Sequence, residues 1–188
     1  MITVLMATYQ GRQYLEQQLD TILAQTVPVK ILISDDGSDD GTREMLDNYA
    51  GWYPEQVVLH HRTEHTGGAA GNFFWLMQEA LKDEKNEYIL FSDQDDVWEN
   101  DKVSVMLHRM KVLEKGLGSA CPILLYSDME VVDEELYEIS PSFASYTHQD
   151  PDRSSFAEIL VENQVTGGAS MINRALLMRC AKAKEVCC

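Results

Sequence analysis

Acidic residues gather in two short segments of this sequence of 188 residues. The first is Asp35-Asp36-Gly37-Ser38 and the second is Asp93-Gln94-Asp95-Asp96, and each follows a short apolar segment. Close carboxylates repel one another, so such a cluster favours a divalent cation or a donor-rich ligand beside it. Asp93 and Asp95 lie two residues apart and can share one face of an extended segment. One of them could hold Mg²⁺ or Mn²⁺ while the other accepts a hydrogen bond from a ribose or sugar hydroxyl.

Two other interpretations of the acidic segments stay open. An acidic turn after a strand is commonly just solvated. Asp36 could also begin an EF-hand calcium loop, because Ser38, Asp40 and Gly41 stand at expected positions. A helix must enter such a loop, yet residues 29–34 are short, apolar and β-branched. Calcium binding is therefore disfavoured.

Several other motifs of phosphate and acyl chemistry are absent from the sequence. It contains no Gly-x-x-x-x-Gly-Lys-Ser/Thr, no Gly-x-Gly-x-x-Gly and no Gly-x-Ser-x-Gly. A glycine-rich piece at residues 66–72 precedes a predicted helix and is a weak signal by itself. The sequence therefore does not favour a P-loop enzyme, a dinucleotide-binding enzyme or an α/β-hydrolase.

Hydrophobic periodicity predicts strands and helices in alternation along the chain. Apolar segments predict strands over residues 2–6, 29–33, 57–60, 88–91 and 123–126. Amphipathic patterns predict helices that begin near Leu15, at Thr42 as N-cap, after Asn72 and near Val103. Apolar strands joined through such helices predict an α/β fold with a mostly parallel sheet covered on both faces. Ligands bind at the carboxyl ends of the strands in such sheets, so both acidic segments are expected at one edge.

The chain is expected to form a single domain over residues 1–188. Its donor half would span about 1–100 and an incomplete acceptor-side half about 101–188. Residues 133–155 are polar and dotted with aromatic side chains, so we expect a long functional loop there. The Cys187-Cys188 end, which has no polar tail, suggests that the chain is C-terminally truncated.

Charge and composition exclude some functions and favour a location. With 15 Lys+Arg against 31 Asp+Glu, the formal net charge is −16, so a nucleic acid or an anionic membrane is not an expected partner. The sequence has neither an apolar run of about 20 residues nor the basic start of a signal peptide. The four cysteines match no disulfide or zinc spacing. These features predict a cytoplasmic protein with reduced thiols.

Five short motifs follow one another along the chain. They are Ala7-Thr8-Tyr9-Gln10-Gly11, the segment 34–42 with Asp-Asp-Gly-Ser, the segment 92–98 with Asp-x-Asp, Tyr126-Ser127-Asp128 and Val165-Thr166-Gly167-Gly168. In this order they resemble the motifs of the inverting family-two glycosyltransferases, which have the nucleotide-sugar fold called GT-A. The resemblance is greatest to the bacterial rhamnosyltransferase-like branch, and it covers nearly the whole chain.

This resemblance implies a reaction and its partners. A sugar, with rhamnose one candidate, would pass from a dTDP- or UDP-linked donor to a hydroxyl group with inversion. The acceptor would be a glycan or lipid-linked precursor of a bacterial surface polysaccharide, with peripheral contact at the inner face of the membrane as one option. Mg²⁺ or Mn²⁺ would offset the charge of the leaving diphosphate.

The resemblance also implies roles for individual residues. Those on the donor are Thr8, Tyr9, Asp35, Asp36, Asp93 and Asp95. Either Asp35 or Asp36 would hold the nucleoside, where a carboxylate can accept the imide N–H of uracil or thymine. Asp93 would contact ribose or sugar, and Asp95 would hold the metal. On the acceptor side the resemblance implies Trp98, Thr166 and Gly167.

Two positions depart from the pattern of this family. Gly71 stands where the family often has a basic residue, so cationic help with the diphosphate must come from elsewhere. The His-Asp pair that carries the general base after the Thr-Gly-Gly block is missing. We therefore expect the base beyond Cys188, with Asp128 as the candidate substitute within the chain. Glu130, also nearby, is interpreted as part of a solvated turn.

Two alternative functions remain on the sequence alone. A sugar nucleotidyltransferase would share the sheet, but it would open with a Gly-rich, basic phosphate loop where this chain has only Gly11-Arg12. A non-catalytic module that binds a metal or a nucleotide sugar is the second alternative. Turnover of the donor separates these functions.

Overall fold

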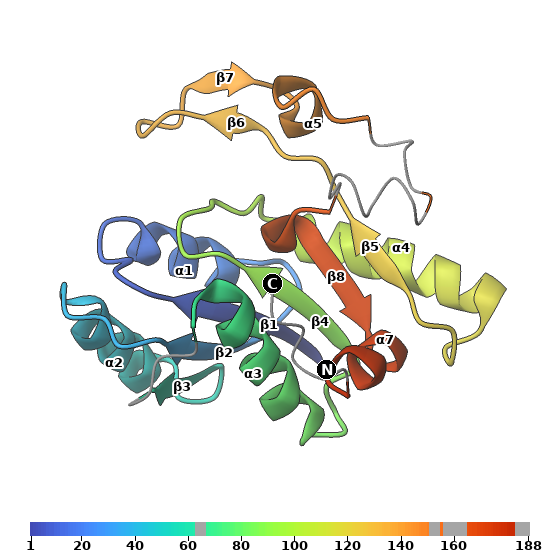
Figure 1. The fold of residues 1–188 in the computed structure, drawn as a ribbon, viewed down its shortest axis with the longest axis horizontal. Helices are drawn as coiled ribbons and strands as arrows, with labels where there is room; N and C mark the ends of the chain where they lie inside the picture. The colour runs from blue at the N-terminus through green and yellow to red at the C-terminus, as the bar shows by residue number, and fades with distance from the viewer. Residues whose placement is uncertain (63–66, 151–154, 156–164, 183–188) are drawn as a thin grey trace.

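The fold is a layered α/β structure around one six-stranded sheet (Figure 1). The computed structural model describes residues 1–62, 67–150, 155 and 165–182. The strands are β1 (Ile2–Thr8), β2 (Lys30–Asp35), β3 (Val57–His61), β4 (Tyr88–Ser92), β5 (Leu124–Tyr126), β6 (Val131–Val132), β7 (Glu138–Ser140) and β8 (Ser170–Asn173). The helices are α1 (Leu15–Leu23), α2 (Thr42–Trp52), α3 (Ala69–Leu81), α4 (Lys102–Leu117), α5 (Phe143–Tyr146) and α7 (Arg174–Cys180), with a 3-10 turn η1 (Gly167–Ala169).

The strands of the main sheet are ordered β3-β2-β1-β4-β8-β5. Strands β1, β2, β3 and β4 run parallel to one another, whereas β8 runs antiparallel to both of its neighbours, β4 and β5. This confirms the predicted α/β fold with a mostly parallel sheet. The antiparallel β8 was not predicted, because its four residues are too few for a periodic pattern and its partners lie far away in the sequence.

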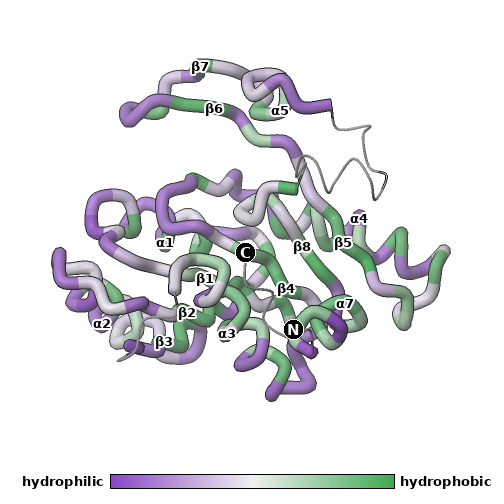
Figure 2. Tube along the Cα trace, in the orientation of Figure 1, coloured by the Kyte–Doolittle hydropathy of each residue, from purple (hydrophilic) through white to green (hydrophobic). Residues whose placement is uncertain are grey.

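Helices cover both faces of the sheet, as predicted. Helices α1, α2 and α4 pack on one face, where Leu19 joins Val4 in one apolar cluster. Helices α3 and α7 pack on the other face, where Leu76 meets Leu5. Successive residues of a strand point to opposite faces, so neighbours in β1 serve different clusters. Figure 2 shows the resulting hydrophobic centre of the sheet.

We predicted Thr42 as the N-cap of helix α2, and this is wrong, because Thr42 is the first residue of the helix. The cap residue is Gly41, whose φ of 96° is a left-handed conformation that favours glycine. Asp40 Oδ1 accepts from the Thr42 N–H at 3.0 Å, while the Thr42 hydroxyl accepts from the N–H of Gly11 at 2.9 Å. The hydroxyl is therefore committed to the loop after β1.

The segment predicted to be one long loop contains regular structure. Strand β7 and helix α5 lie within it, and β7 pairs antiparallel with β6, which ends just before the segment begins. In Figure 1 these elements lie beside the main sheet, beyond the end of β5. Strands of two and three residues escape a periodicity test, which corrects the prediction for this part of residues 133–155. Residues 151–154 lie outside the described part.

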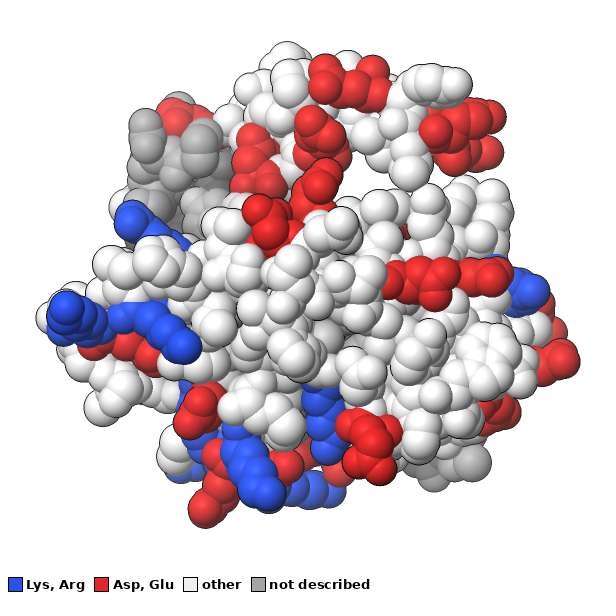
Figure 3. Space-filling model, turned by 180° about the vertical axis from the view of Figure 1, so that it is seen from behind, with Lys and Arg blue, Asp and Glu red and all other residues white. Residues whose placement is uncertain are grey.

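The surface carries mixed charge. On the face shown in Figure 3, the described basic side chains are interspersed with acidic ones and form no continuous basic surface. No helix within the described residues is long and apolar enough to cross a membrane.

Candidate functional site

A cavity of about 610 Å³ opens at the carboxyl ends of three parallel strands, β1, β2 and β4. Its lining residues are Ala7, Thr8, Tyr9, Asp36, Gly67, Gly68, Ala69, Asn72, Asp93, Gln94 and Asp95. The two acidic segments therefore meet at one edge of the sheet, as expected for the switch region of a parallel sheet. Each residue that the resemblance implied for donor binding lines the cavity except Asp35.

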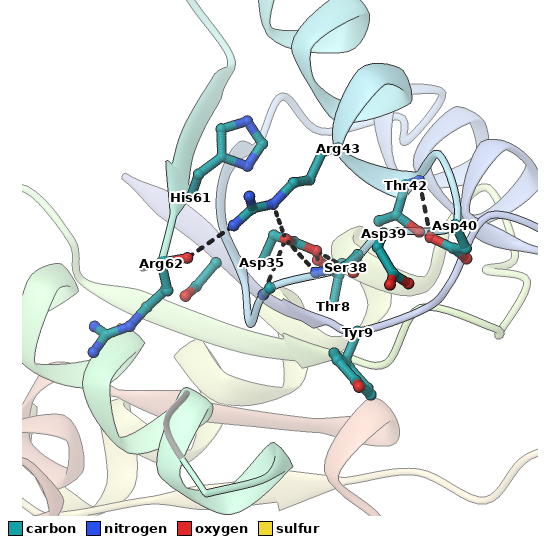
Figure 4. Close-up of polar contacts among 12 residues, drawn as sticks. Thr8, Tyr9, Asp35, Ser38, Asp39, Asp40, Thr42, Arg43, His61 and Arg62 are labelled. Carbon is teal, nitrogen blue, oxygen red and sulfur yellow. Dashed lines mark hydrogen bonds and ion pairs between the residues drawn. The ribbon is translucent and has the colours of Figure 1, made fainter. Parts of the chain in front are cut away.

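Asp35 is fully buried at the end of β2 and is saturated with hydrogen bonds (Figure 4). Its Oδ2 accepts from Arg43 Nε at 2.9 Å and from the Ser38 N–H at 3.0 Å. Its Oδ1 accepts from the hydroxyls of Ser38 and Thr8. Burial raises the pKa of Asp35, but the hydrogen bonds from Ser38 and Arg43 outweigh it and hold the pKa below its usual value. Asp35 thus stabilises the turn, and its carboxylate has little hydrogen-bonding capacity left for a nucleobase.

Asp36 lies in the cavity wall, one residue further along the chain. Its N–H donates to the carbonyl of Thr8 at 2.9 Å, which ties the end of β2 to the end of β1. Asp35 is the last residue of β2 and does not line the cavity, whereas Asp36 follows the strand and does. Tyr9 is 53% exposed at the same wall. The geometry therefore favours Asp36 over Asp35 as the carboxylate next to a ligand.

Gln94 joins the β1 loop to the β4 loop. Its Oε1 accepts from the Tyr9 N–H at 2.9 Å, and its Nε2 donates to the Tyr9 carbonyl at 3.0 Å. A Cβ at Gly11 would collide with the Gln94 side chain, so this approach requires glycine there. Sequence reasoning missed Gln94, because nothing in the motif marks its middle residue as a structural bridge.

The acids after β4 are less well compensated than Asp35. Burial and the nearby charge of Asp95 raise the pKa of Asp93, although a backbone hydrogen bond from Gly168 acts in the opposite direction. Burial and the charge of Asp93 raise the pKa of Asp96 to about 6, and the charge of Lys102 only partly offsets them. Negative charge therefore accumulates beside the cavity without a sufficient protein counter-charge.

The donor set of the cavity suits a metal ion that arrives with phosphate. Within the described part of the chain, no group of three or more His, Cys, Asp or Glu side chains is placed to hold a metal. Mg²⁺, however, is usually held by one or two carboxylates together with substrate phosphates and water. Asp93 and Asp95 supply two carboxylates in the cavity wall, and their mutual repulsion is evident in the raised pKa of Asp93. These residues fit such a shared ion.

The predicted acceptor-side residues lie in different surroundings. Trp98 is 3% exposed and belongs to the apolar cluster beneath α1 and α4, so it packs the core and has little surface for an acceptor. Gly167 is exposed at the start of η1. Thr166 lines a second, smaller cavity of about 70 Å³, whose lining also includes Asp128.

Asp128 is tied to the segment around α5. Its Oδ1 accepts from the backbone N–H groups of Met129 at 2.9 Å and Ala144 at 3.1 Å. A side-chain hydrogen bond with Ser142 is the main cause that lowers the pKa of Asp128. A carboxylate with a lowered pKa is a weak proton acceptor, so this arrangement disfavours Asp128 as the general base. Its hydrogen bond from Ala144 instead ties α5 to the segment that follows β5.

The family of the chain follows from sequence comparison. Residues 3–179 match the profile of Glycosyl transferase family 2. The chain belongs to this family. As a member of glycosyl transferase family 2, it is not the sugar nucleotidyltransferase that the sequence left open.

Related proteins support the family assignment. The dTDP-rhamnosyl transferase RfbG of Shigella flexneri is 39% identical over 99 residues, which are 52% of this chain and 34% of RfbG. TuaG of Bacillus subtilis, named as a glycosyltransferase of teichuronic acid biosynthesis, is 25% identical over 177 residues, which are 92% of this chain and 66% of TuaG. The chain thus spans less than two thirds of either relative.

Solved structures show the same fold. The crystal structure of S. aureus TarS residues 1–349 superposes with a TM-score of 0.58 at 18% identity, over 95% of this chain and 48% of that chain. The complex of TarS with UDP superposes with a TM-score of 0.53 at 20% identity, over 71% of this chain and 36% of that chain. The fold of this family-two chain is therefore GT-A, as the motifs implied.

Proposed function

We propose that the chain carries the donor site of a glycosyltransferase that acts on a bacterial surface polysaccharide precursor. The observation that carries this proposal is the cavity in which Asp36, Asp93 and Asp95 meet at the ends of parallel strands. Family membership and the name of RfbG support sugar transfer, with a dTDP- or UDP-linked donor and rhamnose as one candidate sugar. Inversion through a single displacement belongs to the proposal.

Different residues of the cavity would bind different parts of the donor. Asp36, with Thr8 and Tyr9, would hold the nucleoside, since its carboxylate can accept the imide N–H of uracil or thymine. Asp93 would accept from a ribose or sugar hydroxyl. Asp35 would not contact the donor itself. Its hydrogen bonds instead fix Thr8 and the turn that carries Asp36.

Asp95 would hold Mg²⁺ or Mn²⁺ on the donor diphosphate. Such an ion would offset the negative charge that builds on the leaving diphosphate. The net charge of −16 makes this counter-charge more important, because the uncompensated acids beside the cavity repel a bare diphosphate. Thr166 and Gly167 remain candidates for the acceptor side, next to the Gly168 that contacts Asp93.

Calorimetric titration of UDP and dTDP, with Mn²⁺ and again with EDTA, tests the donor site. We expect one of them to bind in a metal-dependent way, and Asp95→Ala to weaken that binding by about 100-fold without loss of fold. Asp101→Ala is the matched control, because it removes the same charge from an exposed side chain that makes no capping hydrogen bond. Equal affinity in Asp95→Ala would refute its metal role.

Release of the nucleotide from sugar donors, measured in the same preparations, separates an enzyme from a binding module. We expect slow release that depends on Mn²⁺ and on Asp95. Binding without release of nucleotide under any acceptor condition would favour the non-catalytic alternative.

A further inference from the structure

Gly168 contacts Asp93 and Lys102, two residues that are far from it in the sequence. Gly168 lies in η1 and is buried. Its backbone makes a hydrogen bond to the Asp93 carboxylate after β4, and its carbonyl accepts from Lys102 Nζ at 2.9 Å at the start of α4. Gly168 thus connects a partly buried cation to a carboxylate of the donor cavity.

The approach of Gly168 to the acidic loop depends on space. A Cβ at this position would collide with Asp96 Oδ2 and lie 3.3 Å from Asp93 Oδ2. Its φ is not in the left-handed region, so glycine is needed for contact and not for backbone conformation. Any larger residue would push η1 away from the carboxylates or move the carboxylates themselves.

Lys102 is held in place from several sides. Its ammonium lies 4.5 Å from the centroid of the Trp98 ring, and that indole is buried in the core. Burial lowers the pKa of Lys102, and the charge of Asp96 acts in the opposite direction. Lys102 and Asp93 thus bind two different backbone groups of the same residue, the carbonyl and the N–H of Gly168, and together they restrain its position. The core residue Trp98 therefore affects the cavity through Lys102.

We propose that Lys102 is a positioning residue for the donor: it fixes Gly168, and Gly168 fixes the Asp93 carboxylate in the orientation that a donor hydroxyl requires. The inference rests on the proposed donor role of Asp93, and it deepens that role. It also assigns a purpose to the Thr-Gly-Gly block, whose second glycine serves the donor side.

Substitution of Lys102 tests the proposal through nucleotide affinity. Lys102→Met keeps the aliphatic stem on Trp98 and removes the ammonium. We expect it to weaken Mn²⁺-dependent binding of UDP or dTDP by about 10-fold, as for other residues that orient a ligand-binding group. Lys102→Arg, which restores a donor and a cation, should recover part of the affinity. Lys111→Met, on an exposed position of the same helix, should bind like the wild type.

A spectroscopic measurement separates positioning from general stability. Gly-Gly pairs occur in the sequence at Gly67-Gly68 and Gly167-Gly168, so glycine labelled with ¹³C at the carbonyl and with ¹⁵N gives HNCO signals from Gly68 and Gly168 alone. Gly167→Ala assigns the second signal by removing it, and an added Cβ there meets no atom within 4 Å. We expect the Gly168 amide proton to move upfield in both Lys102→Met and Asp93→Asn, and to stay in place in Lys111→Met.

The outcomes separate the inference from the proposed function. Unchanged affinity together with an unchanged Gly168 signal in Lys102→Met would overturn the positioning role and leave the donor site intact. If the wild type binds neither UDP nor dTDP, the proposed function fails, and the Gly168 signal still decides whether Lys102 acts on Asp93 by fixing the position of Gly168. If Lys102→Met does not fold, Lys102→Gln, which also removes the ammonium, and Asp93→Asn supply the same spectroscopic comparison.

Discussion

Two acidic turns at the same edge of the sheet have opposite electrostatic character. In the turn after β2, hydrogen bonds outweigh burial and lower the pKa of both Asp35 and Asp40. In the turn after β4, burial and neighbouring carboxylates raise the pKa of Asp93 and Asp96. The first turn has an arginine, hydroxyls and backbone N–H groups as donors, whereas Lys102 is the nearby cation in the second.

The difference shows that an acidic motif can build a site or bind a ligand. Asp35 spends its hydrogen-bonding capacity inside the protein and shapes the wall that carries Asp36. Asp93 and Asp95 keep uncompensated charge at the cavity, which a diphosphate-bound cation would neutralise. The first turn therefore supplies internal hydrogen bonds, and the second supplies the carboxylates that we propose for the metal and the sugar.

The same substitution made in each turn should give the largest contrast. Asp35→Asn leaves the Arg43 cation without its buried partner, so we expect it to lower the free energy of unfolding by about 2–3 kcal/mol. Asp93→Asn removes a repelled charge and should leave stability unchanged or slightly raised at pH 7. Urea unfolding in EDTA measures both. Equal destabilisation by the two variants would remove the distinction between the turns.

Titration of Asp96 should make the stability of the protein depend on pH. Its pKa of about 6 lies above the usual value of 3.8, so the folded state binds more protons than the unfolded state between these values. Stability from this group therefore rises as the pH falls from 7 toward 4. Asp96→Asn should be more stable than the wild type by about 1–2 kcal/mol at pH 7, with part of the gain offset by the lost partner of Lys102.

The check is urea unfolding of both proteins across this pH range in EDTA. The advantage of Asp96→Asn should shrink toward pH 4, where the wild-type carboxyl is protonated. An advantage that is constant with pH would mean that the variant acts by some route other than titration of Asp96.

Asp40 should show the smallest effect. Its carboxylate accepts from the N–H of Thr42 and from the N–H of Arg12, both at 3.0 Å, and it is exposed to solvent. Asp40→Ala removes a capping interaction at the start of α2, so we expect a loss of about 0.5–1 kcal/mol. Thermal unfolding beside Asp101→Ala is the measurement. A loss as large as that of Asp35→Asn would place the stabilising centre of the turn at Asp40.

Much of the fold could be predicted because the relevant signals are local. The spacing of Leu15, Leu19 and Ile22 predicted α1, and that of Val103, Met106 and Met110 predicted α4, and all six side chains are buried. Strand ends were placed too early by one or two residues at Thr8, Asp35 and Ser92. Those residues are polar, yet they remain in or beside the strand ladder, as the pairing of Thr8 with Asp35 shows.

Other features depend on contacts between distant segments. The hairpin of β6 and β7 and the antiparallel β8 are too short to show a period. The motif around Trp98 implied that this residue contacts the acceptor. Its burial beneath Lys102 results from tertiary packing, which the motif does not show. Gln94 binds Tyr9, which lies 85 residues away in the sequence. Gly168 binds Asp93, which is also far from it in the sequence.

The sequence by itself determined the α/β class, the order of motifs and the convergence of acids on one edge, because apolar periodicity and strand polarity are properties of the chain. Tertiary structure alone decided which acidic residue is held by donors inside the protein and which lines the cavity. Asp35 and Asp36 are identical neighbours in the sequence, and only their places in the fold distinguish them, because Asp35 is bound by Arg43 at the end of β2 and Asp36 lines the cavity.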